Sequence, residues 1–367
     1  MRSPIRFIIS FKFKGWLLPF VLGMVVLPFL DGTSTIAAQS SRIFTDAVAW
    51  SPDGNLIAYG TGPDNCSGCV RFGVSVMNVA TGAIVRTLDA GGSVYALDWS
   101  PDGTRLAAAV STYELFRIWS MTTGQLLAVG TLGGQGGVDV RWRPNSNELA
   151  VTGIGNEAAA FDATSGNLLR ALPTGGRLDF SPDGSQFAAV SFSEENIYIR
   201  DTNTGQVVRF IENPFLHNDV DWNPDGRLLV TSDVGDTVKI WDATTGQQVA
   251  SYNIANVTRV RWSPTLHRVA LVIYDGSVQI LDVARGQIVQ TFITAPFLVA
   301  ADWSPDGLQV VYGGEVLPGQ PPIQIQSVIP AVPTPTLTAS LTLTPTQTLT
   351  FISRPPRSLL WCQSICR

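Results

Sequence analysis

The chain is 367 residues long and 45% hydrophobic, with 24 basic and 29 acidic side chains and a formal net charge of −5. The segment 1–38 contains four of the basic residues and only one acidic residue, so the rest of the chain is more acidic still, and no cluster of Lys and Arg remains there. Because a basic face is what binds phosphate backbones, nucleic acid is excluded as an expected partner.

Residues 1–38 have the organisation of an export segment. Four basic residues precede the apolar run 16–30, and Ala38 ends a short stretch of small residues that suits a cleavage site. The run is shorter than the ~20 residues that a membrane-spanning helix needs. We therefore predict a cleaved signal peptide, with a retained membrane anchor through residues 16–30 as the alternative. Either one predicts an extracytoplasmic protein that is secreted or tethered to the cell surface.

Seven aromatic residues recur through the body of the chain with nearly regular spacing: Trp50, Trp99, Trp142, Phe180, Trp222, Trp262 and Trp303. Five of them are followed by Ser-Pro-Asp-Gly or Asn-Pro-Asp-Gly. These four residues favour a tight turn, because Pro presets the second position and Gly suits the last. A period of roughly 40 residues is typical of propellers whose blades have four strands.

A second turn keeps phase with the first. Gly82, Gly124, Gly166, Gly205, Gly246 and Gly286 follow one another with the same period, mostly after Thr or Ser. In the second repeat these turns delimit strands at 94–99, 105–110, 116–119 and 125–132. The strands are rich in β-branched and aromatic residues, and no stretch has helical periodicity. We predict an all-β, seven-bladed propeller of four-stranded antiparallel blades over residues 39–328.

The segment Val-Lys-Ile-Trp-Asp at 238–242, followed by Thr-Thr-Gly, resembles the third strand and turn of WD40 repeats. Asp236, Trp241 and Asp275 match the turn Asp and the Trp of that family. The resemblance implies a rigid platform that binds other proteins without catalysis. Family blades often carry a Gly-His pair whose His joins a buried network with Ser or Thr, Asp and Trp. This chain has no such pair, so we expect an incomplete network in every blade.

The seventh repeat lacks a fourth strand. In the WD40 family the N-terminal segment usually supplies it, and counting back from Trp50 places it at residues 39–42. Three alternatives remain open: a very short closing strand, a leader that stays attached, or a C-terminal segment that folds back. The third rests on Gln347–Ile352, which loosely resembles Ile288–Ile293.

The C-terminal composition differs from that of the propeller. Residues 329–352 alternate Pro and Thr, which predicts a disordered, extended stalk. Residues 353–367 are too short for a domain, and no role is predicted for them. In the first repeat Cys66 and Cys69 suit a small loop disulfide or two idle thiols, in keeping with an oxidising compartment.

Candidate chemistry is sparse. The two His, His217 and His267, lie in different repeats and neither begins a metal-ligand spacing. There is no phosphate-binding glycine loop and no nucleophile elbow, so we predict no catalytic, cofactor or metal site. The best binding signal is a set of linker residues expected on one face. It comprises Tyr113, Phe215, Leu216 and Phe297, with His217 expected as a solvated residue near one mouth of the channel.

These observations favour a non-catalytic, exported, WD40-like propeller that serves as a protein-interaction scaffold. One alternative is a propeller hydrolase of the lactonase kind with a metal in its channel. The other is an architectural component of the cell envelope. The partner would be an unknown protein or an envelope polymer.

Overall fold

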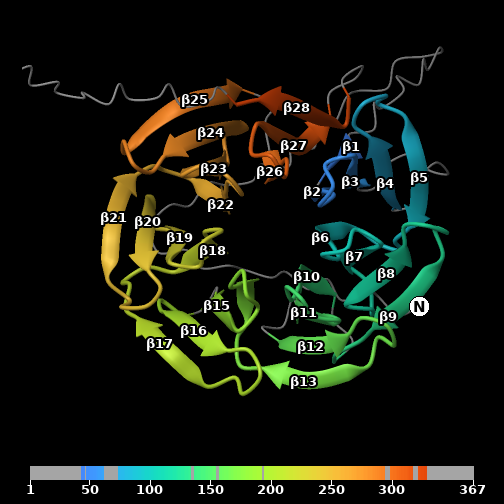
Figure 1. The fold of residues 1–367 in the computed structure, drawn as a ribbon, viewed down its shortest axis with the longest axis horizontal. Coiled ribbons are helices and arrows are strands. Elements are labelled where there is room, and N and C mark those ends of the chain that lie inside the picture. Colours follow the sequence, from blue (N-terminus) through green and yellow to red (C-terminus); the bar gives the residue numbers. More distant parts are fainter. Residues whose placement is uncertain are drawn as a thin grey trace, which may run out of the picture. The chain divides into compact units, whose positions relative to one another are not determined.

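The computed structural model describes residues 43–45, 47–61, 73–133, 136–153, 157–191, 194–293, 298–316 and 321–328. Every regular element in these ranges is a strand, and the strands form seven four-stranded antiparallel sheets. The sheets stand as blades around a central axis (Figure 1). This confirms the predicted all-β, seven-bladed propeller. In the described residues there is no helix long and apolar enough to cross a membrane.

Blades 1 to 6 are meanders of four consecutive strands, with the first strand innermost and the fourth outermost (Figure 1). Blades 1 and 2 contain β2 (Val48–Trp50), β3 (Leu56–Thr61), β4 (Gly73–Asn78), β5 (Ile84–Asp89), β6 (Val94–Trp99), β7 (Arg105–Val110), β8 (Phe116–Ser120) and β9 (Leu126–Gly130). Blades 3 and 4 contain β10 (Gly137–Trp142), β11 (Glu148–Gly153), β12 (Ala158–Asp162), β13 (Leu168–Leu172), β14 (Gly176–Phe180), β15 (Gln186–Ser191), β16 (Ile197–Asp201) and β17 (Val207–Ile211). Blades 5 and 6 contain β18 (His217–Trp222), β19 (Leu228–Asp233), β20 (Thr237–Asp242), β21 (Gln248–Asn253), β22 (Val257–Trp262), β23 (Arg268–Ile273), β24 (Ser277–Asp282) and β25 (Gln287–Ile293).

The hydrophobic core lies between neighbouring blades. One cluster joins Ala58 and Val74 of blade 1 to Leu97 and Leu106 of blade 2. Second strands such as β11 and β23 are buried along their whole length, because each is covered on both faces. Blades approach closely enough that a Cβ on Gly60 would lie 2.7 Å from the Cβ of Val94. This packing explains why the strands are apolar on both faces.

Both predicted turns hold their shape through side-chain hydrogen bonds. In the first-to-second-strand turn, Ser100 Oγ donates to Asp102 Oδ1 at 2.6 Å, and the same bond recurs in the equivalent turns of blades 1, 4 and 7. The bond from Ser100 and the Thr104 N–H lower the pKa of Asp102 to about 2. In the third-to-fourth-strand turn, Asp242 Oδ1 accepts from Thr245 Oγ1 at 2.9 Å.

A short N-terminal strand joins the seventh blade. Blade 7 contains β26 (Leu298–Trp303), β27 (Gln309–Val316), β28 (Ile323–Ser327) and the two-residue strand β1 (Ile43–Phe44). β1 pairs with the end of β27, at Val316 and Glu315, and not with β28. The segment 39–42, in which the closing strand was predicted, lies outside the described residues.

Other contacts join blade 7 to blade 1. Asp302 Oδ2 accepts the Trp50 N–H at 2.8 Å, and Thr45 Oγ1 donates to the Pro322 carbonyl at 2.9 Å. Val48 and Ile57 of blade 1 share a buried apolar cluster with blade 7. The leader 1–38, the stalk 329–352, the tail 353–367, Cys66, Cys69 and Phe297 lie outside the described residues.

Candidate functional site

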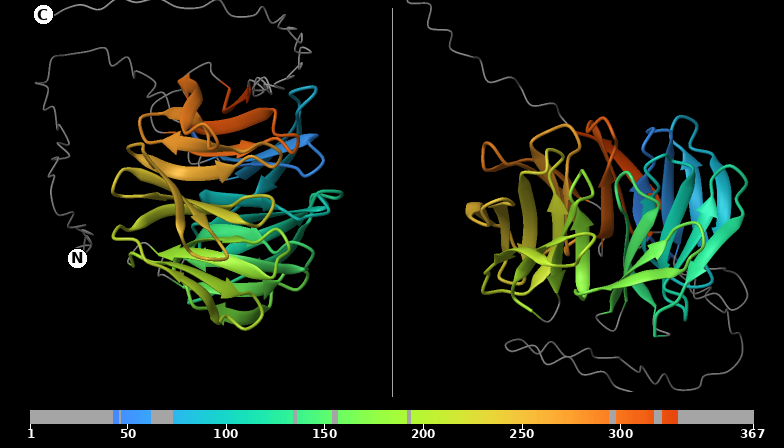
Figure 2. Two further views of the ribbon diagram at one scale, coloured as in Figure 1. Left: turned by 60° about the vertical axis from the view of Figure 1, so that its left-hand side comes forward. Right: turned by 60° about the horizontal axis from the view of Figure 1, so that its bottom comes forward.

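The meander gives the ring two unlike faces (Figure 2). Turns between first and second strands and between third and fourth strands lie on one face, which we call the turn face. Second-to-third-strand turns and the links between blades lie on the other, which we call the loop face. The strongly exposed aromatic or aliphatic side chains of the described loop-face turns are Tyr113 (83%), Tyr274 (61%), Val234 (52%) and Phe215 (39%).

Three of these residues belong to adjacent blades. Phe215 and Val234 lie in loops of blade 5 and Tyr274 lies in a turn of blade 6. The Tyr274 N–H bonds the Asn256 carbonyl, and the Asn256 N–H bonds Asp236 Oδ1, so the two blades are connected here. We call Phe215, Val234 and Tyr274 the aromatic patch. Tyr113 lies in blade 2, across the ring, so the structure does not bring it to the patch (Figure 1).

Phe215 is held by its own blade. The Lys239 ammonium lies 5.2 Å from the centre of the Phe215 ring, within the range of a cation–π contact. A Cβ on Gly235 would come within 2.8 Å of the ring, so only Gly allows this approach. Leu216 is half-buried, and its carbonyl accepts the Val234 N–H at 2.9 Å. The aromatic ring is therefore presented in one fixed position.

A buried polar cluster lies below Phe215. Lys239 Nζ donates to Asp233 Oδ2 at 2.8 Å and to Asn213 Oδ1 at 2.6 Å, and Thr237 Oγ1 donates to Asp233 Oδ2 at 2.7 Å. Burial by itself raises the pKa of Asp233, but the hydrogen bonds from Lys239, Thr237 and Asn213 bring it below its usual value. Because the buried charges are paired and hydrogen-bonded, the cluster fixes the loop that carries Phe215.

His217 belongs to this cluster and not to the surface. Its side chain is 1% exposed at the start of β18, and Asn213 Nδ2 lies 3.1 Å from its Nε2. Burial lowers the pKa of His217 to about 4, so the ring is neutral at pH 7. The expectation of a solvated residue near the channel mouth is therefore wrong. His267 is exposed, as expected, and lies edge-on to Trp262.

The three residues matched to the family motif make local contacts. Trp241 Nε1 donates to Thr231 Oγ1 at 2.9 Å inside blade 5. Asp236 has a positive φ of 59° in its turn, and Asp275 Oδ1 accepts from the Ser277 hydroxyl at 2.8 Å. The Trp–Thr part of the family network is thus present in blade 5. The blade also contains a polar cluster, where we expected only turn chemistry and apolar packing.

Four channel carboxylates were not predicted from the sequence. Asp98, Asp179, Asp221 and Asp302 each precede the repeated aromatic residue, and each accepts the backbone N–H of the Trp in the next blade at 2.6 to 2.8 Å. The recurrence of Asp directly before the aromatic residue was the available signal. Burial raises the pKa of Asp98 to about 7, although nearby Arg141 and the Trp142 N–H oppose the change.

Arginines balance these carboxylates. Arg141, Arg259 and Arg261 line a channel cavity of about 300 Å³ together with Asp98, Asp139, Asp221 and Asp302. Asp219 accepts the Val260 N–H at 3.0 Å and Arg261 Nη1 at 2.8 Å. In the described ranges no three His, Cys, Asp or Glu are placed to hold a metal ion. The arrangement can connect blades, since its carboxylates bond backbone groups of the following blade.

Comparisons with known proteins agree with this architecture. The family model described as "WD domain, G-beta repeat" matches residues 82–120, and that of "Eukaryotic translation initiation factor eIF2A" matches residues 176–273. The chain is 27% identical to WD repeat-containing protein 1 of Gallus gallus over 178 residues, 45% of this chain and 29% of that protein. The chain is thus similar to WD40-repeat proteins and folds as a seven-bladed propeller.

A second relative matches more of the chain. The guanine nucleotide-binding protein subunit beta of Zea mays is 24% identical over 233 residues, which is 58% of this chain and 61% of that protein. The propeller therefore spans less than two thirds of the relatives' own length. WD40 propellers are in general scaffolds that bind other proteins.

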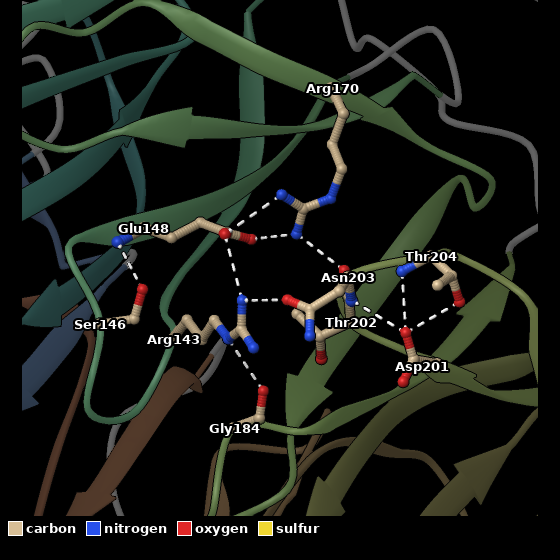
Figure 3. A network of polar contacts seen from close by, with 9 residues as sticks. All are labelled: Arg143, Ser146, Glu148, Arg170, Gly184, Asp201, Thr202, Asn203 and Thr204. Carbon is tan, nitrogen blue, oxygen red and sulfur yellow. Dashed lines mark hydrogen bonds and ion pairs between the residues drawn. The ribbon is translucent and has the colours of Figure 1, made fainter.

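On the turn face of the propeller, a polar network joins blades 3 and 4 (Figure 3). Glu148 accepts hydrogen bonds from both Arg170 and Arg143. Arg170 Nη2 also donates to the Thr202 carbonyl at 2.7 Å, and Arg143 Nη1 to Asn203 Oδ1 at 2.9 Å. Blade 3 thus bonds both a backbone carbonyl and a side chain of blade 4. These charged residues therefore stabilise the packing of the two blades.

Proposed function

We propose that this protein is an exported, non-catalytic WD40 propeller that binds a protein partner through the aromatic patch of its loop face. The observation that carries the proposal is the exposure of Phe215, Val234 and Tyr274 on loops that hydrogen bonds hold in place. Exposed aromatic side chains at such positions are typical hot spots of protein interfaces. A preformed loop also loses little conformational entropy when it binds.

A second set of exposed apolar residues does not compete with the patch as a specific site. The outer strands of blades 1 to 6 all have exposed apolar side chains within their first two residues, which are Ile84, Val85, Leu126, Leu127, Leu168, Leu169, Val207, Val208, Val249 and Ile288. Because they recur in blade after blade, they belong to the repeat. The patch residues occur once each, so they can distinguish one partner from another.

The surroundings of the patch favour a basic partner surface. Glu212, Asp236 and Asp275 are exposed beside it, whereas Lys239 is buried in the cluster below. A partner with apolar side chains flanked by Lys or Arg would complement this surface. Since exposed charges are screened by salt, the complex should weaken as the ionic strength rises.

The proposal is tested by measuring how much protein from a secreted fraction binds to the immobilised wild type and to a double variant. Val234→Ser with Tyr274→Ala leaves the Lys239 cluster untouched and should reduce binding at least tenfold. Tyr113→Ala, an exposed aromatic residue on another blade of the same face, is the matched control and should bind like wild type. Equal binding by all three proteins would reject the patch as the site.

Export rests on the leader sequence and is tested separately. The basic start, the apolar run 16–30 and the small residues up to Ala38 support it. N-terminal sequencing of the protein recovered from its own host should start near residue 39 if the leader is cleaved. A start at Met1 in a membrane fraction would support the anchor instead, and a start at Met1 in the cytoplasm would reject export.

A further inference from the structure

Among the described residues, the third strand of blade 7 has an open edge, whereas a fourth strand covers this edge in blades 1 to 6. In blades 1 to 6 the third strand pairs with both the second and the fourth strand, whereas among the described residues β28 pairs only with β27. The Val328 N–H bonds the Leu308 carbonyl. Since alternate residues of a strand face opposite edges, Ile323, Ile325 and Ser327 direct their backbone groups to the open side. An unpaired edge of this kind is a template for another strand.

Fourth strands supply a buried apolar residue in the other blades. It stands six residues after the turn Gly, and Leu88, Leu172, Ile211 and Phe292 are examples. Phe292 of blade 6 stacks on Tyr312 of blade 7, with ring centres 6.1 Å apart. Tyr59 occupies the same position in blade 1, nine residues after Trp50, as Tyr312 follows Trp303. Blade 7 contributes no described fourth-strand residue to contact Tyr59.

We propose that the chain's own segment Gln347–Ile352 adds to β28 as the fourth strand of blade 7. Its sequence Gln-Thr-Leu-Thr-Phe-Ile ends in the same three residues as β25, Gln-Ile-Val-Gln-Thr-Phe-Ile. Thr, Phe and Ile favour strands. Phe351 corresponds to Phe292 and would stack on Tyr59, next to Ile323 and half-buried Ile325.

The register follows from blade 6. There Phe292 lies opposite Val278 and Gln290 opposite Ile280. Gln309 is equivalent to Arg268, so Ser327, which pairs with Gln309, is equivalent to Asp282. Phe351 would therefore lie opposite Ile323, and Leu349 opposite Ile325. Both pairs place apolar side chains together on the face that meets blade 1.

Chain direction favours this segment over the N-terminal one. β1 and β28 both run antiparallel to β27, so they run in the same direction. A fourth strand must run antiparallel to β28, and residues before β1 would have to reverse to do so. The C-terminal segment leaves β28 directly, and the stretch 328–346 is far longer than most hairpin loops need. The Pro/Thr segment would then be a closed loop beside blade 7.

Hydrogen exchange of the full-length chain tests the proposal. In wild type the amides of Ile325 and Ser327 should be protected. Leu349→Pro removes a ladder donor and Phe351→Ser removes the stacking side chain, and each should speed exchange at β28 at least tenfold. Thr338→Pro, in the Pro/Thr segment, is the control and should exchange like wild type.

Two results would overturn the proposal. The first is rapid exchange at β28 in every protein, which would mean that no strand covers the edge. The second is protection that persists in both Leu349→Pro and Phe351→Ser, which would assign the edge to another occupant such as the N-terminal segment or a partner strand. Binding through the aromatic patch is measured independently, so either outcome leaves the proposed function standing.

Discussion

The hydrogen bond between Trp241 and Thr231 is the clearest single-residue contact inside a blade. Thr231 is 1% exposed and its hydroxyl is the acceptor for the indole N–H. Thr152 in β11 is equally buried, yet its hydroxyl has no hydrogen-bond partner among the described residues. The two Thr therefore separate the contribution of the hydrogen bond from that of the buried side chain.

Thr231→Val should lower the free energy of unfolding by about 1–3 kcal/mol, because it leaves the buried Trp241 N–H without an acceptor. Thr152→Val should change it by less than about 1 kcal/mol, since no bond is lost. Urea denaturation of the two variants and wild type measures both values. Equal losses would show that the Trp–Thr bond adds nothing specific.

At the scale of elements, blade docking depends on charge as well as on apolar packing. Glu148 of β11 is nearly buried between Arg143 and Arg170, and both guanidinium groups continue to blade 4 (Figure 3). Removal of the carboxylate leaves two cations facing each other. Such a loss costs more than that of an exposed ion pair, because the remaining charges have little solvent around them.

Glu148→Gln should destabilise the protein by about 2–4 kcal/mol in thermal or urea unfolding. Glu157→Gln, an exposed Glu just before β12 in the same blade, should change stability by less than about 0.5 kcal/mol. A Glu148 variant as stable as the Glu157 variant would contradict a role for this network in docking blades.

At the scale of the molecule, the channel collects half-buried carboxylates from four blades. Burial raises the pKa of Asp98, Asp179 and Asp302, and that of Asp221 well above its usual value. The folded chain therefore holds protons that the unfolded chain releases above about pH 4. For these groups stability is greatest below that pH and falls as the pH rises through the folded pKa values.

Asp98→Asn keeps an acceptor for the Trp142 N–H but removes one titrating group with a folded pKa of about 7. The decline in unfolding free energy between pH 5 and pH 8 should therefore shrink by about 1–3 kcal/mol. Asp102→Asn is the control, because the pKa of about 2 in the turn confines its effect to lower pH. An unchanged pH slope in Asp98→Asn would contradict the channel's part in this dependence.

The fold was predictable because two turn motifs keep phase through the chain. The expected strands 94–99 and 105–110 match β6 and β7. The repeats also indicated the channel carboxylates, because Asp recurs directly before the repeated aromatic residue. The sequence does not, however, show which backbone N–H each carboxylate accepts. That N–H belongs to the Trp of the next blade, which is distant in the sequence.

Other features were not accessible from the repeat. His217 is buried because Asn213, Asp233 and Lys239 surround it, and these residues occur together in one blade only. Because this set of residues does not recur in the other blades, no repeated pattern could predict that His217 is buried. Ring closure was uncertain for a similar reason, since β1 is too short for any strand pattern to identify.

The two faces differ in symmetry. The turn face repeats the same Ser–Asp and Asp–Thr bonds from blade to blade, so a molecule docked there would find several nearly equivalent rotational positions around the axis. The loop face has no such equivalence, because Phe215, Val234 and Tyr274 stand on one arc of the ring. A partner bound to that arc can take only one rotational orientation about the propeller axis. Any domain joined to the partner is then oriented as well.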